Sequence, residues 1–332
     1  MEKKGTHTPA PICPDIPWST WMREHSPLES VIACVDAARR ASPDLLVTIG
    51  GGSVIDTAKI VQLAMTHEIR TIDQLLERAN KPTLGPSRIR QVMVPTTLSG
   101  SEFTNGAGSL DQRKKLKVGF SCSDMCAHTI VLDPALSLHT PEKLWYSTAV
   151  RSIDHAVESF CAAAANPYIR ASTWQSVRMF FSSLRRTKQN PDDLDARLTS
   201  QQAVWLATAG VFRVPMGASH GISYLLGSVG GAPHGYTSCV TLPAVLRWNE
   251  PVNRDLQREL AEAIGNPGRS VADSLSELLD ELGLPRKLSD IGITPEMIPQ
   301  IMKYALQSPI VGANPRPIKT EDDVMEILKL AS

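Results

Sequence analysis

Apolar positions follow two different periods along the chain. Before about residue 140, short apolar runs of strand length alternate with segments in which apolar residues recur every three or four positions. Strands separated by helices favour a parallel sheet, whose ligands bind at the carboxyl ends of the strands. The elements expected in this part are helices at 27–41 and 54–65 and strands at 45–49, 90–95 and 129–132.

After residue 140 the pattern is almost entirely helical. The expected helices are 143–164, 169–185, 193–209, 253–263, 271–282, 295–306 and 322–331. The first 25 residues hold four prolines among polar neighbours, which predicts an irregular arm. The predicted organisation is therefore an arm at 1–25, an α/β domain at 26–140 and a helical domain at 141–332.

Composition narrows the class of function. With 42% hydrophobic and 20% charged residues and a formal net charge of zero, the 332-residue chain is typical of a globular protein without a basic surface. This argues against nucleic acid or an anionic membrane as partner and favours a small-molecule ligand. No apolar run approaches the roughly 20 residues of a membrane span. Six cysteines without framework spacing indicate reduced thiols, so we expect a cytoplasmic protein.

Three consecutive glycines follow the first predicted strand directly and open the next helix. Residues without a Cβ allow a sharp turn and bring backbone N–H groups close to a ligand, while the helix dipole adds positive potential. A pyrophosphate is the natural ligand, although such a turn can also bind nothing. The residues predicted to hold it are Gly50, Gly51, Gly52, Ser53 and Asp56.

A second motif, rich in hydroxyl groups, follows the strand at 90–95. Its side chains would donate to phosphate or ribose oxygens, and Gly100 would allow close approach of the backbone. The alternative is an ordinary loop that caps the following helix. The candidate cofactor residues here are Thr96, Thr97, Ser99 and Ser101. We call this segment, residues 96–102, the hydroxyl loop.

The helical part carries the candidate catalytic groups. Arg151 and His155 are four residues apart on one predicted helix face, and His220 and Tyr224 repeat this spacing. His234 stands between a proline and a glycine, on a predicted turn. Three imidazoles from different elements suit zinc or iron, whereas each histidine alone is more often a hydrogen-bonded structural residue.

Together these motifs resemble the iron-containing alcohol dehydrogenase family, and its maleylacetate reductase branch in particular. The resemblance runs from about residue 26 to the end of the chain, and the short hydroxyl loop is similar to the maleylacetate reductase form. It implies a dehydroquinate synthase-like fold, with a Rossmann-like domain that binds NAD(P)(H), a helical domain, and hydride transfer in the cleft between them. It also implies that His155, His220 and His234 match the histidines of the family's metal site.

The chain departs from the family at that metal site. Arg151 stands where the family has an Asp or Asn ligand, and a guanidinium cannot ligate a cation. Asp154 projects about 100° from His155 around the helix, so we do not expect it to replace the ligand. We therefore expect weak binding of iron or zinc, or none. In this interpretation Arg151 binds a substrate carboxylate or enolate oxygen, and His220, His234 or Tyr224 supplies the proton.

A second departure concerns the sheet. By the resemblance, a strand, a helix and another strand would precede the helix at 27–41, but here only the predicted arm does. The sheet is thus predicted to be a truncated parallel sheet with an exposed edge, which would also allow a homodimer.

The predicted function is an NAD(P)-dependent oxidoreductase. Its expected substrate is a small acid or polyketide-like molecule, anionic or carbonyl-bearing, in which it reduces a carbonyl or a conjugated double bond. Two alternatives stay open. One is a dehydratase, isomerase or cyclase that uses Arg151, Tyr224 and the histidines without nicotinamide, and the other is an inactive scaffold.

Overall fold

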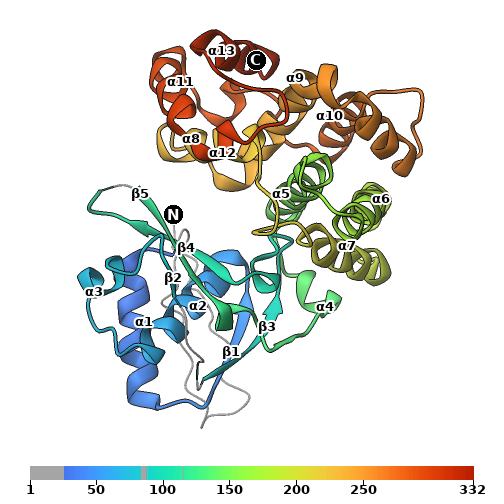
Figure 1. Ribbon diagram of the computed structural model, residues 1–332. Coiled ribbons are helices and arrows are strands. Elements are labelled where there is room, and N and C mark those ends of the chain that lie inside the picture. The colour runs from blue at the N-terminus through green and yellow to red at the C-terminus, as the bar shows by residue number, and fades with distance from the viewer. Residues whose placement is uncertain (1–25, 84–86, 88, 115) are drawn as a thin grey trace, which may run out of the picture.

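The computed structural model describes residues 26–332 apart from 84–86, 88 and 115. The arm predicted at 1–25 lies outside the described residues. Figure 1 shows an α/β part formed by the first half of the chain and a helical part formed by the second half. The predicted combination of an α/β region and a helical region is confirmed.

Three parallel strands form the sheet of the α/β part, in the order β1-β3-β6. They are β1 (Leu45–Gly50), β3 (Arg90–Pro95) and β6 (Thr129–Ile130). The last strand is shorter than the sequence predicted. Helices α1 (Leu28–Ala41) and α2 (Gly52–Thr66) pack on each other and share a hydrophobic core.

Strand β1 lies at the edge of this sheet and exposes every second side chain. The exposed fractions are 44% for Leu45, 61% for Val47 and 43% for Ile49, whereas Thr48 between them is buried. Parallel sheets are normally covered on both faces. The described residues leave this face uncovered, which agrees with the predicted truncated sheet.

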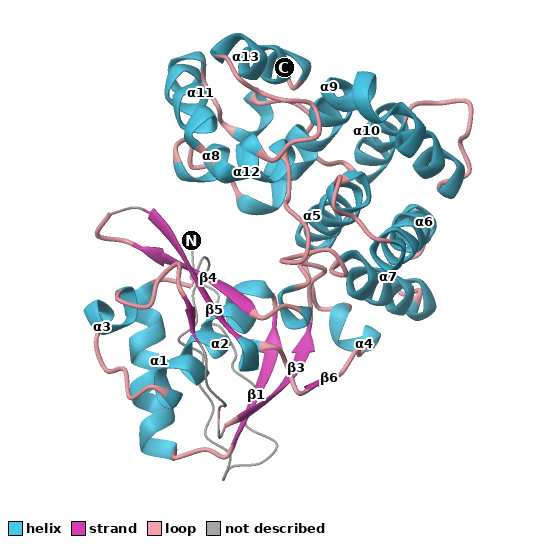
Figure 2. Ribbon diagram, in the orientation of Figure 1, coloured by secondary structure: helices cyan, strands magenta, loops and turns pink. Residues whose placement is uncertain are grey.

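The structure has a second sheet, of mixed type, that the sequence analysis did not predict. It has the order β2-β5-β4, with β4 (Gly106–Asp111) antiparallel to β5 (Leu116–Cys122) and β2 (Pro82–Thr83) parallel to β5. Figure 2 shows the β4–β5 hairpin on the side of the α/β part that faces helix α8 (Ala218–Ser228). The glycines of these strands conceal the alternating pattern that would have predicted them.

The helical part surrounds α5 (Glu142–Cys161), which is buried along most of its length. Several helices have side-chain N-caps, for example Asn166 for α6, Asp193 for α7 and Ser270 for α10. The remaining elements are α3 (Ile72–Leu76), α4 (Pro134–Ser137), α6 (Pro167–Gln189), α7 (Leu194–Ala207), α9 (His234–Ala263), α10 (Val271–Leu282), α11 (Ile298–Gln307), α12 (Pro309–Gly312) and α13 (Glu321–Leu330), with short 3₁₀ turns at Ser101–Phe103, Ser123–Met125, Ser289–Ile291 and Pro295–Met297.

Helix α9 differs most from the sequence prediction. The sequence predicted a helix only at 253–263, but α9 begins at His234 and continues past Pro243 and Pro251, with a kink at Asn253. His234 is therefore the first residue of a helix and not part of a turn. Among the described helices, none is both long and apolar enough to cross a bilayer.

Candidate active site

Helix α2 begins at a glycine N-cap. Gly51 has no side chain that could cap the helix, and the first turn holds no acidic residue. The first N–H groups of a helix lack intrahelical partners and carry the positive end of its dipole. Gly50 enters the turn at φ +155°, which residues with a side chain rarely adopt. The start of α2 is therefore suited to bind a phosphate group.

The hydroxyl loop packs directly against this turn. A Cβ atom at Gly51 would lie 2.8 Å from Thr97 Cγ2, and one at Gly52 would lie 2.7 Å from Ser99 Oγ. The two hydroxyl oxygens, Thr97 Oγ1 and Ser99 Oγ, are 3.2 Å apart. Glycine at both positions thus brings hydroxyl donors next to the N–H groups of α2, as expected for a site that holds a diphosphate.

Lys59 anchors the other end of the hydroxyl loop. It is fully buried, and its ammonium donates to the backbone carbonyls of Ser101, Thr104 (2.7 Å) and Gly106 (2.9 Å). Burial lowers its pKa, and neighbouring carboxylates oppose this. Ser101 Oγ donates to Asp56, so these two predicted cofactor residues bond to each other and tie α2 to the loop.

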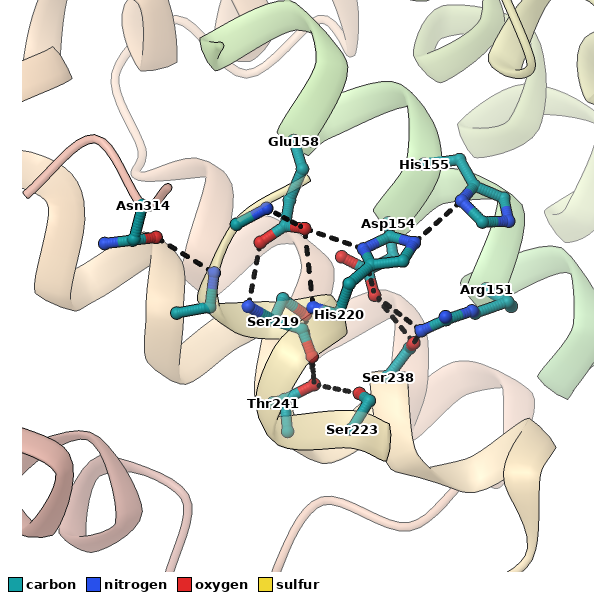
Figure 3. Close-up of polar contacts among 12 residues, drawn as sticks. Arg151, Asp154, His155, Glu158, Ser219, His220, Ser223, Ser238, Thr241 and Asn314 are labelled. Atoms are coloured by element: carbon teal, nitrogen blue, oxygen red, sulfur yellow. Dashed lines mark hydrogen bonds and ion pairs between the residues drawn. The ribbon is translucent and has the colours of Figure 1, made fainter. Parts of the chain in front are cut away.

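A second group of polar side chains lies on α5 and the helices packed against it (Figure 3). Arg151 Nη1 donates to Asp154 Oδ2 at 3.3 Å and to Ser238 Oγ at 2.9 Å. Ser238 Oγ donates in turn to the same carboxylate oxygen at 2.7 Å. All three side chains are buried, so the charge of Arg151 is neutralised inside the protein by Asp154.

Glu158 caps the first turn of α8. Its carboxylate accepts hydrogen bonds from the backbone N–H groups of Gly217 (2.9 Å), Ser219 (2.8 Å) and His220 (3.4 Å). Asn314 Oδ1 accepts a fourth, from the N–H of Ala218 at 3.1 Å. The helix start that carries the predicted His220 is thus held by a buried acidic side chain from α5.

His220 joins this cap to His155. Its Nδ1 lies 2.6 Å from Glu158 Oε2 and 3.5 Å from Asp154 Oδ2, while its Nε2 lies 2.7 Å from His155 Nδ1. Asp154 and His155 therefore both reach His220, from opposite sides of its ring. Asp154 was not expected to replace the missing metal ligand, because it projects about 100° from His155 around α5. Both side chains nevertheless contact His220, whose ring lies between the two directions in which they point.

The charges of the cluster fix its protonation. Burial and Arg151 lower the pKa of His220, but Asp154 and Glu158 outweigh them and raise it to about 9. Burial and the His220 charge hold the pKa of His155 well below its usual range. Burial raises the pKa of Asp154, but His220 and Arg151 overcome this and lower it to about 2. At neutral pH a charged His220 therefore donates both N–H groups, to Glu158 and to a neutral His155.

This cluster does not fit a divalent cation. Ligand atoms of Asp154, Glu158 and His220 lie within 4.8 Å of one another, a spacing seen at metal sites. However, the Glu158 oxygens are occupied by backbone donors, and Arg151 places a positive charge beside Asp154. The 2.7 Å contact between His155 and His220 is also shorter than the separation of roughly 3 Å or more between two nitrogens bound to one zinc.

Tyr224 stands between two cations. The Arg151 guanidinium lies 5.3 Å from the centre of its ring, and Lys117 Nζ, from β5 of the α/β part, lies 5.8 Å from it. Burial acts to raise the pKa of Tyr224, but Arg151, Lys117 and His220 outweigh it and lower the pKa. Lys117 was not among the predicted residues, and it brings the α/β part into contact with the catalytic candidates.

The structure thus brings together most of the predicted residues. Thr96, whose N–H bonds to Gly50 at 3.0 Å, lies beside the glycine turn. Arg151, His155, His220 and Tyr224 form one group. The side chain of His234 lies outside what the structure describes. Among the supporting residues, the sequence analysis did not name Lys59, Lys117, Glu158 and Ser238, and it set Asp154 aside.

Comparisons with known proteins agree with this architecture. The family described as iron-containing alcohol dehydrogenase matches residues 16–134, and the C-terminal domain of the Fe-containing alcohol dehydrogenase family matches residues 146–332. Dehydrogenase ALT3 of Alternaria alternata is 33% identical over 92% of this chain and 89% of its own length. Maleylacetate reductase 1 of Cupriavidus pinatubonensis is 27% identical over 92% of this chain and 77% of its own length.

Solved structures give the same result. An alcohol dehydrogenase from Oenococcus oeni superposes with a TM-score of 0.85 at 26% identity, covering 94% of this chain and 82% of that one. The two family matches together account for both structural parts, and the similar proteins are dehydrogenases and reductases. The chain therefore belongs to the iron-containing alcohol dehydrogenase family and is an oxidoreductase.

Proposed function

We propose that this protein is an NAD(P)-dependent reductase of a carbonyl group, or of a double bond conjugated to one, in a small acid or polyketide-like substrate. The observation that carries the proposal is the glycine start of α2 packed against the hydroxyls of Thr97 and Ser99. That contact requires glycine at positions 51 and 52. A turn that binds nothing would not need such a close contact. The nicotinamide cofactor, when bound, supplies the hydride.

On the cofactor side, the residues of the chain bind and orient. The N–H groups at the start of α2 and the hydroxyls of Thr97 and Ser99 would hold the diphosphate of the cofactor. Lys59, which is buried, and Asp56 hold the loop in place through their hydrogen bonds to it. Ser101 has the same supporting role in this proposal, because its hydroxyl is donated to Asp56.

On the substrate side, Arg151 and Tyr224 act on the oxygen. Reduction adds a hydride to carbon and a proton to the carbonyl or enolate oxygen. Arg151 stabilises the negative charge that develops on this oxygen, and the Tyr224 hydroxyl, whose pKa is lowered by the adjacent cations, donates the proton. In this proposal His220 carries the positive charge that pairs with Asp154 and Glu158, and the neutral His155 holds the His220 ring in position.

Cofactor titration tests this function. Purified protein is mixed with NADH and, separately, NADPH up to millimolar concentration, and binding is followed by nicotinamide fluorescence and by the unfolding temperature. We expect saturable binding of at least one of them and a higher unfolding temperature. If neither cofactor changes either signal, the reductase function is wrong and a non-redox reaction on the same scaffold becomes the explanation.

We further propose that the site works without a metal ion, since Arg151 holds the positive charge that a metal would provide. The purified protein is expected to contain no stoichiometric iron or zinc by elemental mass spectrometry. Arg151→Asp, which restores a carboxylate there, should raise zinc affinity by about tenfold or more. Stoichiometric metal in the unsubstituted protein, lost when His155 and His220 are replaced, would contradict the proposal.

A further inference from the structure

A cavity adjoins the buried cluster where the end of α5, the middle of α9 and the chain before α8 meet. Its volume is about 130 Å³. Most of its wall is apolar and includes the buried side chains of Val157, Leu242 and Leu246. The described residues that line it include none of those assigned above to the cofactor or to the substrate oxygen. The cavity is therefore separate from the proposed cofactor and substrate positions.

Glu158 belongs both to the cluster and to the wall of this cavity. Its Oε2 accepts from the N–H of Gly217 and lies 2.6 Å from His220 Nδ1, whereas its Oε1 accepts from the N–H of Ser219 at 2.8 Å. A carboxylate oxygen can accept two hydrogen bonds, so Oε1 can take a further donor. His220 already balances the charge of Glu158, and no Lys or Arg is found among the described lining residues. The cavity therefore favours a neutral ligand and disfavours an anion.

Asn253 offers the cavity a hydrogen-bond donor. The residue lines the cavity and is only 7% exposed, at the kink of α9. Its Oδ1 accepts from Gln257 Nε2 at 2.9 Å, but its Nδ2 has no hydrogen-bond partner within the described part of the chain. A buried amide without a partner is rare, because leaving it unpaired costs free energy. A ligand with an acceptor atom would satisfy it.

Small residues form the entrance to the cavity. Ala164, Pro215 and Ala313 line it and are exposed, whereas Cys161 and Leu242 in its wall are buried. An apolar cavity of about 150 Å³ accepts one benzene molecule. This cavity therefore has room for a single ring or a short branched chain, and such a molecule can enter past side chains that are no larger than proline.

We propose that this cavity is a second ligand site, which binds one small neutral alcohol or phenol. The apolar body of the ligand packs against Val157 and Leu246. Its hydroxyl group accepts from Asn253 Nδ2 or donates to Glu158 Oε1, since a hydroxyl can do either. Because Glu158 also holds the start of α8 and the ring of His220, the bound molecule contacts the active-site cluster without entering the active site. The site is therefore placed to regulate the enzyme.

Three matched probes test the ligand class: phenol, toluene and benzoate, which share one ring and differ in its substituent. Their binding to the full chain is measured by titration calorimetry. Phenol should bind at one site, toluene should bind about tenfold more weakly, and benzoate should not bind. Asn253→Leu keeps the approximate size of the side chain but removes the donor, so it should reduce the preference for phenol. Benzoate that binds as well as phenol, or no binding of phenol at millimolar concentration, would overturn the inference.

Two tryptophan variants test the location. Ala164→Trp places a large side chain at the entrance and should abolish the binding of phenol. Ala135→Trp makes the same change at an exposed alanine of α4 that does not line the cavity, and phenol should bind to it as before. Both positions are exposed, so both variants should unfold within a few degrees of the unsubstituted protein. If phenol bound equally well to both variants, the ligand would lie elsewhere and the inference would be wrong.

The cofactor titration keeps the second site distinct from the reductase function. Ala164→Trp should bind NADH or NADPH as the unsubstituted protein does, because Ala164 lies outside the proposed cofactor position. If phenol binds as expected and neither cofactor does, the second site stands and only the reductase function is wrong. If a cofactor binds and phenol does not, the reductase function stands and the second site is wrong.

Discussion

The two sides of the candidate site use different physical means. The start of α2 offers uncharged groups, namely backbone N–H donors and the hydroxyls of Thr97 and Ser99, in a geometry that two glycines permit. The cluster on α5 consists of charged side chains that neutralise one another in the protein interior. One side depends on the shape of the backbone and the other on the balance of buried charges.

This difference predicts different consequences of substitution. A turn that depends on shape can lose its ligand while the protein stays folded, because its groups bond to the ligand and not to the core. Removal of one side chain from a buried charge network lowers the free energy of unfolding more strongly, because the groups left behind stay buried without a partner. The comparison is therefore tested by measuring stability and cofactor binding on the same variants.

The largest effect is expected from Glu158→Ala. The substitution leaves the N–H groups of Gly217 and Ser219 and the charged ring of His220 without their acceptor in the interior. The free energy of unfolding should fall by about 3 to 5 kcal/mol, measured by urea denaturation.

Two further variants calibrate that loss. Glu158→Gln keeps the shape and one acceptor oxygen, and should be intermediate. Glu250→Ala breaks an exposed ion pair with Arg254 and should cost less than about 1 kcal/mol. If Glu158→Ala were no more destabilising than Glu250→Ala, the buried cluster would not be part of what holds α8 against α5.

A smaller effect, dependent on pH, is expected from His220. Its pKa is about 9 in the folded protein, above the usual value of 6.5, so the folded state holds the proton more tightly. The stabilisation is complete below about pH 6.5 and is lost as the pH rises through 9. Its full size is roughly 3 kcal/mol.

The measurement compares unfolding free energies of the protein and of His220→Gln between pH 6 and pH 10. Other groups titrate in this range in both proteins, so the difference between the two curves isolates His220. That difference should shrink as the pH rises. A difference that stays constant across the range would mean that His220 is neutral in the folded protein.

The same contrast explains what the sequence could predict. The glycine turn and the hydroxyl loop are each continuous in the sequence, and their chemistry depends on residue types that are informative by themselves, so the sequence could name Gly51, Gly52 and Thr97 as candidates. Histidines at helical spacing also identified His155 and His220. In each case the signal lies within a few residues, where local periodicity is reliable.

The partners that complete the site come from distant segments. Ser238 is 87 residues from Arg151 and Lys117 belongs to a hairpin that the sequence did not reveal, so neither contact follows from local periodicity. Asp154 was considered and set aside on the angle between neighbouring residues of one helix. That argument considered α5 alone. The ring of His220 packs against α5 between the directions in which Asp154 and His155 point, so it contacts both side chains.

The smallest effect on stability, and the one specific to the cofactor side, is expected from Gly52→Ala. The added Cβ would overlap Ser99 Oγ, which lies 2.7 Å from its position, so the loop must move away from the start of α2. Stability should change by less than about 1 kcal/mol, because alanine is also the better helix former. NADH affinity should fall by about tenfold, measured by nicotinamide fluorescence. Gly268→Ala, where an added Cβ meets no atom within 4 Å, should change neither quantity.

Ser99→Gly removes the overlapping hydroxyl and completes a double-mutant cycle. If the loss in Gly52→Ala comes from that overlap, the double variant should bind NADH no more weakly than Ser99→Gly alone, which gives a coupling of about 1 kcal/mol. Additive losses would mean that Gly52 is needed for close approach of the ligand itself and not for the position of the loop. Either way, a loss of stability in Gly52→Ala as large as that in Glu158→Ala would remove the distinction between a site that depends on backbone shape and one that depends on buried charge.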